Sequence, residues 1–101
     1  MSEFNEEFDE IRVTETNQTN DGWTFLVELG YGDGLAEYIV DVDVDYWTKL
    51  TGRRIEPDEL VKTSFEFLLS KEQKELIFKK FNLADVSGSF PMYESEIKRR
   101  L

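Results

Sequence analysis

The sequence predicts an α+β fold, in which a three-stranded antiparallel meander is followed by three to four helices packed on one sheet face. Between residues 10 and 43, apolar and polar side chains alternate with period two, and glycine-containing turns separate the runs. From residue 45 onward the apolar spacing becomes that of amphipathic helices, with capping residues at their ends. Strands followed by helices, without alternation of the two, favour α+β over α/β.

Three segments are predicted strands. Residues 10–18 alternate β-branched with polar side chains, and residues 19–22 form a turn signal that ends in Asp-Gly. Residues 23–31 place large apolar side chains on one face, and the Gly-rich residues 30–34 form a second hairpin turn into a strand over 37–43. This Gly-rich turn lacks the Gly-Lys-Ser/Thr sequence of a phosphate loop, so we interpret it as structural.

Two helices follow the predicted sheet. Asp45 is expected to cap a short helix over 46–51, which Gly52 ends. Pro57 is expected to open a longer helix that reaches about Leu69. Its apolar stripe consists of Leu60, Val61, Ser64, Phe65, Leu68 and Leu69, and Phe67 widens it.

The C-terminal third is expected to add one or two more helices. Ser70 with Gln73 fits a capping box that would open a helix over 71–81. Residues 83–90 are ambiguous because Ser-Gly-Ser weakens a helix, and Pro91 can open a last helix. The side chains expected to face inward are Ile77, Phe78, Phe81, Tyr93, Ile97 and Leu101.

Length and composition limit the chemistry. The 101 residues predict one domain over 1–101, with residues 1–9 as a frayed tail. Without cysteine or histidine the chain can form no disulfide, no thiolate or imidazole metal site, and no Ser-His-Asp triad. We therefore expect no enzyme activity and assign no catalytic, cofactor-binding or metal-binding residue and no cofactor.

The N-terminus and the net charge bear on location and partners. The first residues lack the basic and apolar regions of a signal peptide, and no apolar run approaches the ~20 residues that span a bilayer. We expect a soluble, cytoplasmic protein without a membrane partner. A net charge of −10 makes nucleic acid an unfavourable partner and favours a basic or neutral one.

Asp41 and Asp43 form the first candidate site. Strand alternation places both carboxylates on one face, near the Gly-rich turn. An EF-hand loop counted from Asp41 would need Gly and Glu where Tyr46 and Gly52 stand, so we reject that motif. A looser small-ligand or divalent-metal site remains an alternative, beside the simpler interpretation of a solvated polar face.

Two basic clusters and three aromatic residues complete the candidates. Arg53 and Arg54 beside Lys49 could hold an anion or pair with nearby acids. The C-terminal run Lys98, Arg99 and Arg100 could contact nucleic acid, although helix-dipole and ion-pair spacing also explain it. Trp23, Trp47 and Tyr46 are of residue types common in interface hot spots, but core packing is the simpler expectation.

The C-terminal 55 residues resemble a family of short, uncharacterised prokaryotic proteins. Residues 46–52, 57–61 and 64–69 are similar to the family pattern Y-x-x-L-T-G-G, P-E-E-L-V and S-F-x-F-L-L, and 90–94 is similar to its Y-F-P-x-Y-E ending. Arg53 stands where the family has the second Gly. The resemblance implies a compact, free-standing cytosolic prokaryotic protein, but no activity and no site residue.

These observations favour a small acidic protein-interaction module without catalytic activity, whose function and partner are otherwise unknown. Residues 1–48 hold 13 acidic side chains and one basic one, whereas residues 49–101 hold 9 acidic and 11 basic ones. We therefore expect a partner at the acidic sheet half or at an exposed edge strand. The two halves could instead attract each other within the fold.

Overall fold

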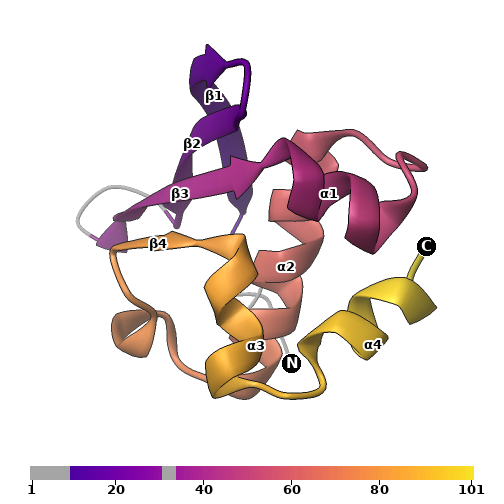
Figure 1. Cartoon of the computed structure of the whole chain (residues 1–101). Helices are drawn as coiled ribbons and strands as arrows, with labels where there is room; N and C mark the ends of the chain where they lie inside the picture. Colours follow the sequence, from indigo (N-terminus) through magenta and orange to yellow (C-terminus); the bar gives the residue numbers. More distant parts are fainter. Residues whose placement is uncertain (1–9, 31–33) are drawn as a thin grey trace.

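The computed structural model describes residues 10–30 and 34–101 and has an α+β architecture (Figure 1). Its sheet has the order β1-β2-β3-β4, and α2, α3 and α4 lie together on one side of it. The strands are β1 Ile11–Thr19, β2 Gly22–Leu29, β3 Ala36–Asp43 and β4 Lys80–Asn82. The α-helices are α1 Val44–Thr51, α2 Pro57–Lys71, α3 Val86–Ser89 and α4 Tyr93–Arg99, and single 3₁₀ turns span Lys74–Leu76 and Leu83–Asp85.

The first three strands form the predicted antiparallel meander. Phe25 pairs with Val40 and Val27 with Tyr38 across β2 and β3, and all four side chains are buried. Gly22 is required at the start of β2, because a Cβ there would lie 2.1 Å from the Val42 carbonyl oxygen. The pairing of β1 with β2 shifts by one residue between Glu15 and Asn17, which is a β-bulge on an edge strand.

The predicted helix over 71–81 is wrong. Part of that segment instead forms a fourth strand parallel to β3, so the sheet is mixed. The chain leaves α2 at Lys71, makes one 3₁₀ turn and adds β4 in parallel to β3. Hydrogen bonds to β3 hold this path: the Ile39 amide donates to the Lys79 carbonyl and the Tyr38 hydroxyl to the Lys74 carbonyl, both at 2.7 Å. These tertiary bonds override the local helical signal. Ile77 is buried and Phe81 half-buried as expected, but Phe78 points to solvent.

The helix ends follow local chemistry, with one correction. Asp45 does not cap α1; the helix begins at Val44, directly after β3, and the Val44 amide donates to the Asp21 carbonyl at 2.8 Å. Gly52 ends α1 as predicted, in the left-handed conformation with φ 63°. Pro57 opens α2 as predicted, while the Glu56 amide donates to the Glu59 carboxylate at 3.1 Å.

The core lies on both sides of α2. Toward the sheet, the ring of Phe65 contacts Tyr38 and Phe81, with centroids 5.2 and 6.0 Å apart. On its other side, Phe67 contacts Phe90 and Tyr93 at 5.8 and 5.4 Å. The ambiguous residues 83–90 form the 3₁₀ turn and α3, and α4 begins two residues after Pro91.

A buried hydrogen bond joins α2 to α4. The Ser64 hydroxyl donates to the Leu60 carbonyl at 2.7 Å and lies 2.6 Å from the Tyr93 hydroxyl oxygen. Since the single Ser64 proton is used by Leu60, Tyr93 donates to Ser64. Both side chains are fully buried, and burial raises the pKa of Tyr93 above its usual range.

Some sequence expectations lie outside the described residues. These are the frayed tail over 1–9 and the part of the second turn at 31–33. In the ranges that the structure covers, no helix has both the length and the apolar character needed to cross a membrane.

We expect Ser64→Ala to cost more stability than Tyr93→Phe. Ser64→Ala leaves the buried Tyr93 hydroxyl without an acceptor, which should lower the free energy of unfolding by about 1–3 kcal/mol. Tyr93→Phe leaves Ser64 bonded to Leu60 and should cost about 0.5–1.5 kcal/mol. Urea denaturation of both variants measures the difference, and the reverse order would contradict the assigned direction of the bond.

Gly52 and Gly88 should respond oppositely to alanine. Gly52 has φ 63°, where an alanine is strained, so Gly52→Ala should lower the free energy of unfolding by about 1–2 kcal/mol. Gly88 lies in α3 with open space around its Cα, so Gly88→Ala should raise it by up to about 1 kcal/mol. Thermal unfolding of the pair tests this, and equal shifts would refute it.

Candidate functional site

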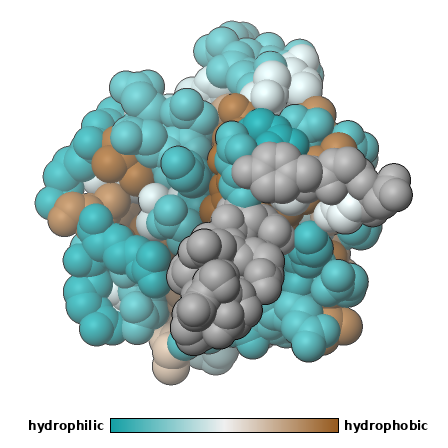
Figure 2. All heavy atoms as spheres, turned by 180° about the vertical axis from the view of Figure 1, so that it is seen from behind, coloured by the Kyte–Doolittle hydropathy of each residue, from teal (hydrophilic) through white to brown (hydrophobic). Residues whose placement is uncertain are grey.

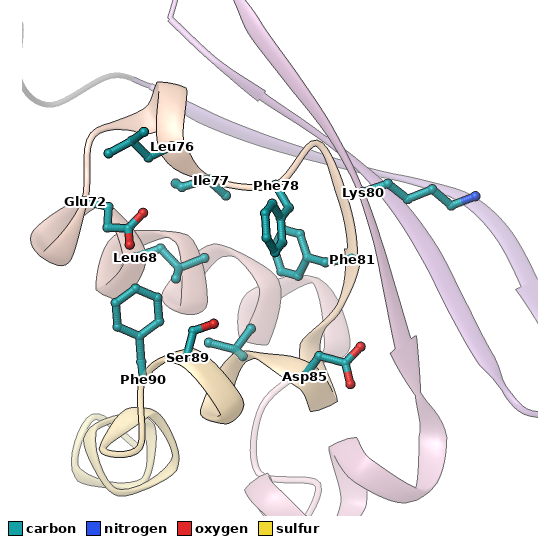
Figure 3. Close-up of a pocket in the computed structure, with 11 residues that line it drawn as sticks. Leu68, Glu72, Leu76, Ile77, Phe78, Lys80, Phe81, Asp85, Ser89 and Phe90 are labelled. Atoms are coloured by element: carbon teal, nitrogen blue, oxygen red, sulfur yellow. The ribbon is translucent and has the colours of Figure 1, made fainter.

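One hollow on the described surface is an apolar groove at the C-terminal end of α2. It lies between α2, the segment that leads into β4, and the segment that forms α3, with a volume of about 290 Å³ (Figure 3). We call it the α2–β4 groove. Its lining consists of Leu68, Glu72, Leu76, Ile77, Phe78, Lys80, Phe81, Asp85, Val86, Ser89 and Phe90.

Two large apolar side chains at the groove are exposed. Leu76 is 65% exposed and Phe78 74% exposed, whereas Ile77 between them is buried. Phe78 and Phe81 both line the groove (Figure 3). Hydrophilic residues make up most of the coloured part of the face seen in Figure 2, with hydrophobic patches among them. Of the five exposed large hydrophobic side chains among the described residues, Phe78 is the most exposed.

The sheet pairing creates this exposure. In the predicted helix over 71–81, Phe78 would have faced inward; in the extended path to β4, Ile77 and Phe81 take the inner positions. Ile39 pairs with Lys80 and Val40 with Phe81, which fixes where the segment before β4 meets the sheet. The site was therefore missed from sequence. The consecutive Leu-Ile-Phe run at 76–78 was nevertheless a signal, because a single helix stripe cannot bury three consecutive side chains.

Asp41 and Asp43 lie on the outer face of β3, as strand alternation predicted. The Asp41 carboxylate accepts a hydrogen bond from Thr24 at 2.7 Å, and the Asp43 carboxylate accepts one from Asn82 at 3.3 Å. With Asp21 they line a polar hollow of about 190 Å³. Within residues 10–30 and 34–101, however, no three acidic side chains converge on a metal-sized position.

Part of each basic cluster is engaged in contacts within the chain. The Arg53 guanidinium lies 5.2 Å from the Trp47 ring centroid, and its Nε donates to Thr48. Arg53 also has a φ of 64°, in the left-handed region that favours glycine. Near the C-terminus, Arg99 pairs with Glu96 at 2.6 Å and Arg100 with Glu66 at 3.9 Å. Lys49, Arg54 and Lys98 are exposed.

The three aromatic candidates pack against the core and are half-buried. Trp23 and Trp47 meet edge to face with centroids 5.3 Å apart, and the Trp47 indole N–H donates to the Ile55 carbonyl at 2.9 Å. The Tyr46 hydroxyl donates to Glu94 at 2.8 Å, which ties α1 to α4. Burial, followed by this hydrogen bond, raises the pKa of Tyr46 above its usual range. These contacts use all three side chains in packing.

Comparison with known proteins finds no matching family model, no matching curated protein and no matching solved structure. The resemblance to short prokaryotic proteins therefore stays a prediction. The functional argument rests on the α2–β4 groove itself.

Phe78 and Phe81 should differ sharply in their contribution to stability. Phe78→Ala removes an exposed ring and should change the free energy of unfolding by less than about 0.5 kcal/mol. Phe81→Ala removes the ring that packs against Phe65 and should lower it by about 2 kcal/mol or more. Urea denaturation measures both. A large loss in Phe78→Ala would mean that its ring serves the fold.

Proposed function

We propose that this chain is a small, acidic, non-catalytic protein-interaction module that receives apolar side chains of a partner in the α2–β4 groove. The observation that carries the proposal is Phe78, 74% exposed beside an open apolar hollow. Burying a phenylalanine stabilises by about 1.5–3 kcal/mol, and the folded chain leaves most of that unrealised here. A partner that covers the ring gains it on binding.

The size of the groove favours side chains over a free ligand. Small-molecule sites are typically about 300–1,000 Å³ and enclose most of their ligand, and a groove of about 290 Å³ lies just below that range. Partly exposed aromatic and aliphatic side chains around such a hollow resemble the anchor pockets of protein interfaces. One or two apolar side chains on a polypeptide segment fit this space.

The titratable groups support a non-catalytic role. Histidine and cysteine are absent from the sequence, which leaves Tyr, Ser, Lys and carboxylates for any chemistry. The Tyr46 and Tyr93 hydroxyls donate hydrogen bonds inside the fold, and their pKa values are raised. Raised values keep both groups protonated and weak as nucleophiles at neutral pH. A cytoplasmic location in a prokaryotic cell is part of the same proposal.

A second candidate is binding of a small polar ligand or a divalent cation at Asp41 and Asp43. The polar hollow beside these two carboxylates is the observation in its favour. Amide NMR spectra recorded during titration with Ca²⁺, Mg²⁺ and Mn²⁺ decide it. Shifts confined to residues 34–46 would support this candidate, and their absence would remove it.

The proposed function is tested by affinity capture from a lysate of the source cell, with tagged wild-type chain and two alanine variants. We expect Phe78→Ala to lose at least one protein that wild type retains, because the ring forms part of the docking surface. Met92→Ala is the matched control, since Met92 is 52% exposed and does not line the groove. It should retain the same proteins as wild type.

Two results would contradict the groove as the docking surface. One is an identical set of captured proteins for wild type and Phe78→Ala. The other is loss of capture only when Glu37, Asp41 and Asp43 are changed to lysine, which would move the interaction to the acidic outer face of β3.

A further inference from the structure

Two carboxylates line the apolar α2–β4 groove. Glu72 follows the last residue of α2, and Asp85 ends the 3₁₀ turn before α3; Figure 3 shows them on opposite sides of the groove. Among the described residues, neither side chain has a hydrogen-bond or ion-pair partner. The apolar hollow thus has an uncompensated negative charge on either side.

The lysines nearby are directed elsewhere. Lys71 lies over the Phe67 ring at 5.6 Å, and Lys79 lies over the Tyr38 ring at 4.7 Å. The Lys74 ammonium donates to the Gly34 carbonyl at 3.0 Å. Lys80 lines the groove, but Figure 3 shows its side chain extending away, across the sheet. Within the described part of the chain, none of these four side chains forms an ion pair with Glu72 or Asp85.

The dipole of α2 and the net charge of the chain also make the groove attractive to cations. The C-terminal end of α2 carries the negative end of the helix dipole and lies beside Glu72. The chain as a whole has a net charge of −10, which attracts cations at long range and speeds their encounter. A second copy of this chain would bring another −10 and another pair of groove carboxylates, so self-association at this surface is disfavoured.

We propose that the occupant of the α2–β4 groove is a basic amphipathic segment of a partner protein. Its apolar side chains would fill the space among Phe78, Phe81 and Leu68. Its lysines or arginines would pair with Glu72 and Asp85. This inference rests on the proposed function, because it specifies the partner of the same groove.

The experiment uses the full ¹⁵N-labelled chain and two synthetic helical peptides of equal length. Both carry leucine at the same positions, and the remaining positions are lysine in one peptide and glutamate in the other. We expect the Leu/Lys peptide to shift the amide resonances of residues 68–90 and to bind at least tenfold more tightly than the Leu/Glu peptide. Phe78→Ala should weaken this binding.

Charge reversal separates groove contacts from long-range attraction. Glu72→Lys combined with Asp85→Lys should weaken Leu/Lys binding about tenfold, because two attractive contacts become repulsive. Glu15→Lys combined with Asp21→Lys is the matched control: it changes the net charge equally, at exposed positions on the β1–β2 hairpin. It should reduce binding far less.

Each alternative outcome has a distinct meaning. If neither peptide shifts residues 68–90, the groove is not a docking surface and the proposed function fails with it. If the Leu/Glu peptide binds the groove as tightly as the Leu/Lys peptide or more so, the groove stands as a docking surface and the basic partner is wrong. If both double variants weaken binding equally, the attraction is to the net charge and the inference is overturned.

Discussion

The burial of α2 on two opposite sides is the constraint on which the other elements depend. Successive helix positions differ by 100°, so Phe65 and Phe67 point in nearly opposite directions. Phe65 packs on rings from β3 and β4, and Phe67 packs on rings from the α3 and α4 region. The helix therefore joins the sheet to the C-terminal helices, and neither layer is complete without it. On the side of α2 that faces the C-terminal helices, the buried Ser64–Tyr93 hydrogen bond also joins α2 to α4.

The α2–β4 groove forms where the chain leaves α2 and returns to the sheet. α2 stops at Lys71, and the chain must turn back to reach the edge of β3 within a few residues. The hydrogen bonds from Tyr38 and Ile39 fix that return path, and Ile77 and Phe81 fill the space below it. Phe78 lies two residues before β4 and is left on the outside of this path, 74% exposed. The exposed ring is thus a geometric consequence of pairing β4 with β3 in this register.

Much of the fold could be predicted from local signals. The alternation in β1 to β3, Gly52 at the end of α1 and Pro57 at the start of α2 are encoded within a few residues of where they act. The parallel pairing of β4 was missed because its hydrogen bonds come from β3, some forty residues away, while the local sequence favours a helix. The α2–β4 groove was missed for the same reason, since the exposure of Phe78 depends on that pairing.

The charge distribution shows how sequence totals and local electrostatics differ. The acidic excess lies in residues 1–48, and the half that contains the groove has slightly more basic than acidic side chains. Composition alone would therefore place an acidic partner on the second half. The groove has the opposite character, because Lys71 and Lys79 lie over aromatic rings and Lys80 extends over the sheet, while Glu72 and Asp85 line the hollow. The preference of the groove for a partner is determined by where these five side chains point, because each charge acts over a distance shorter than the width of the fold.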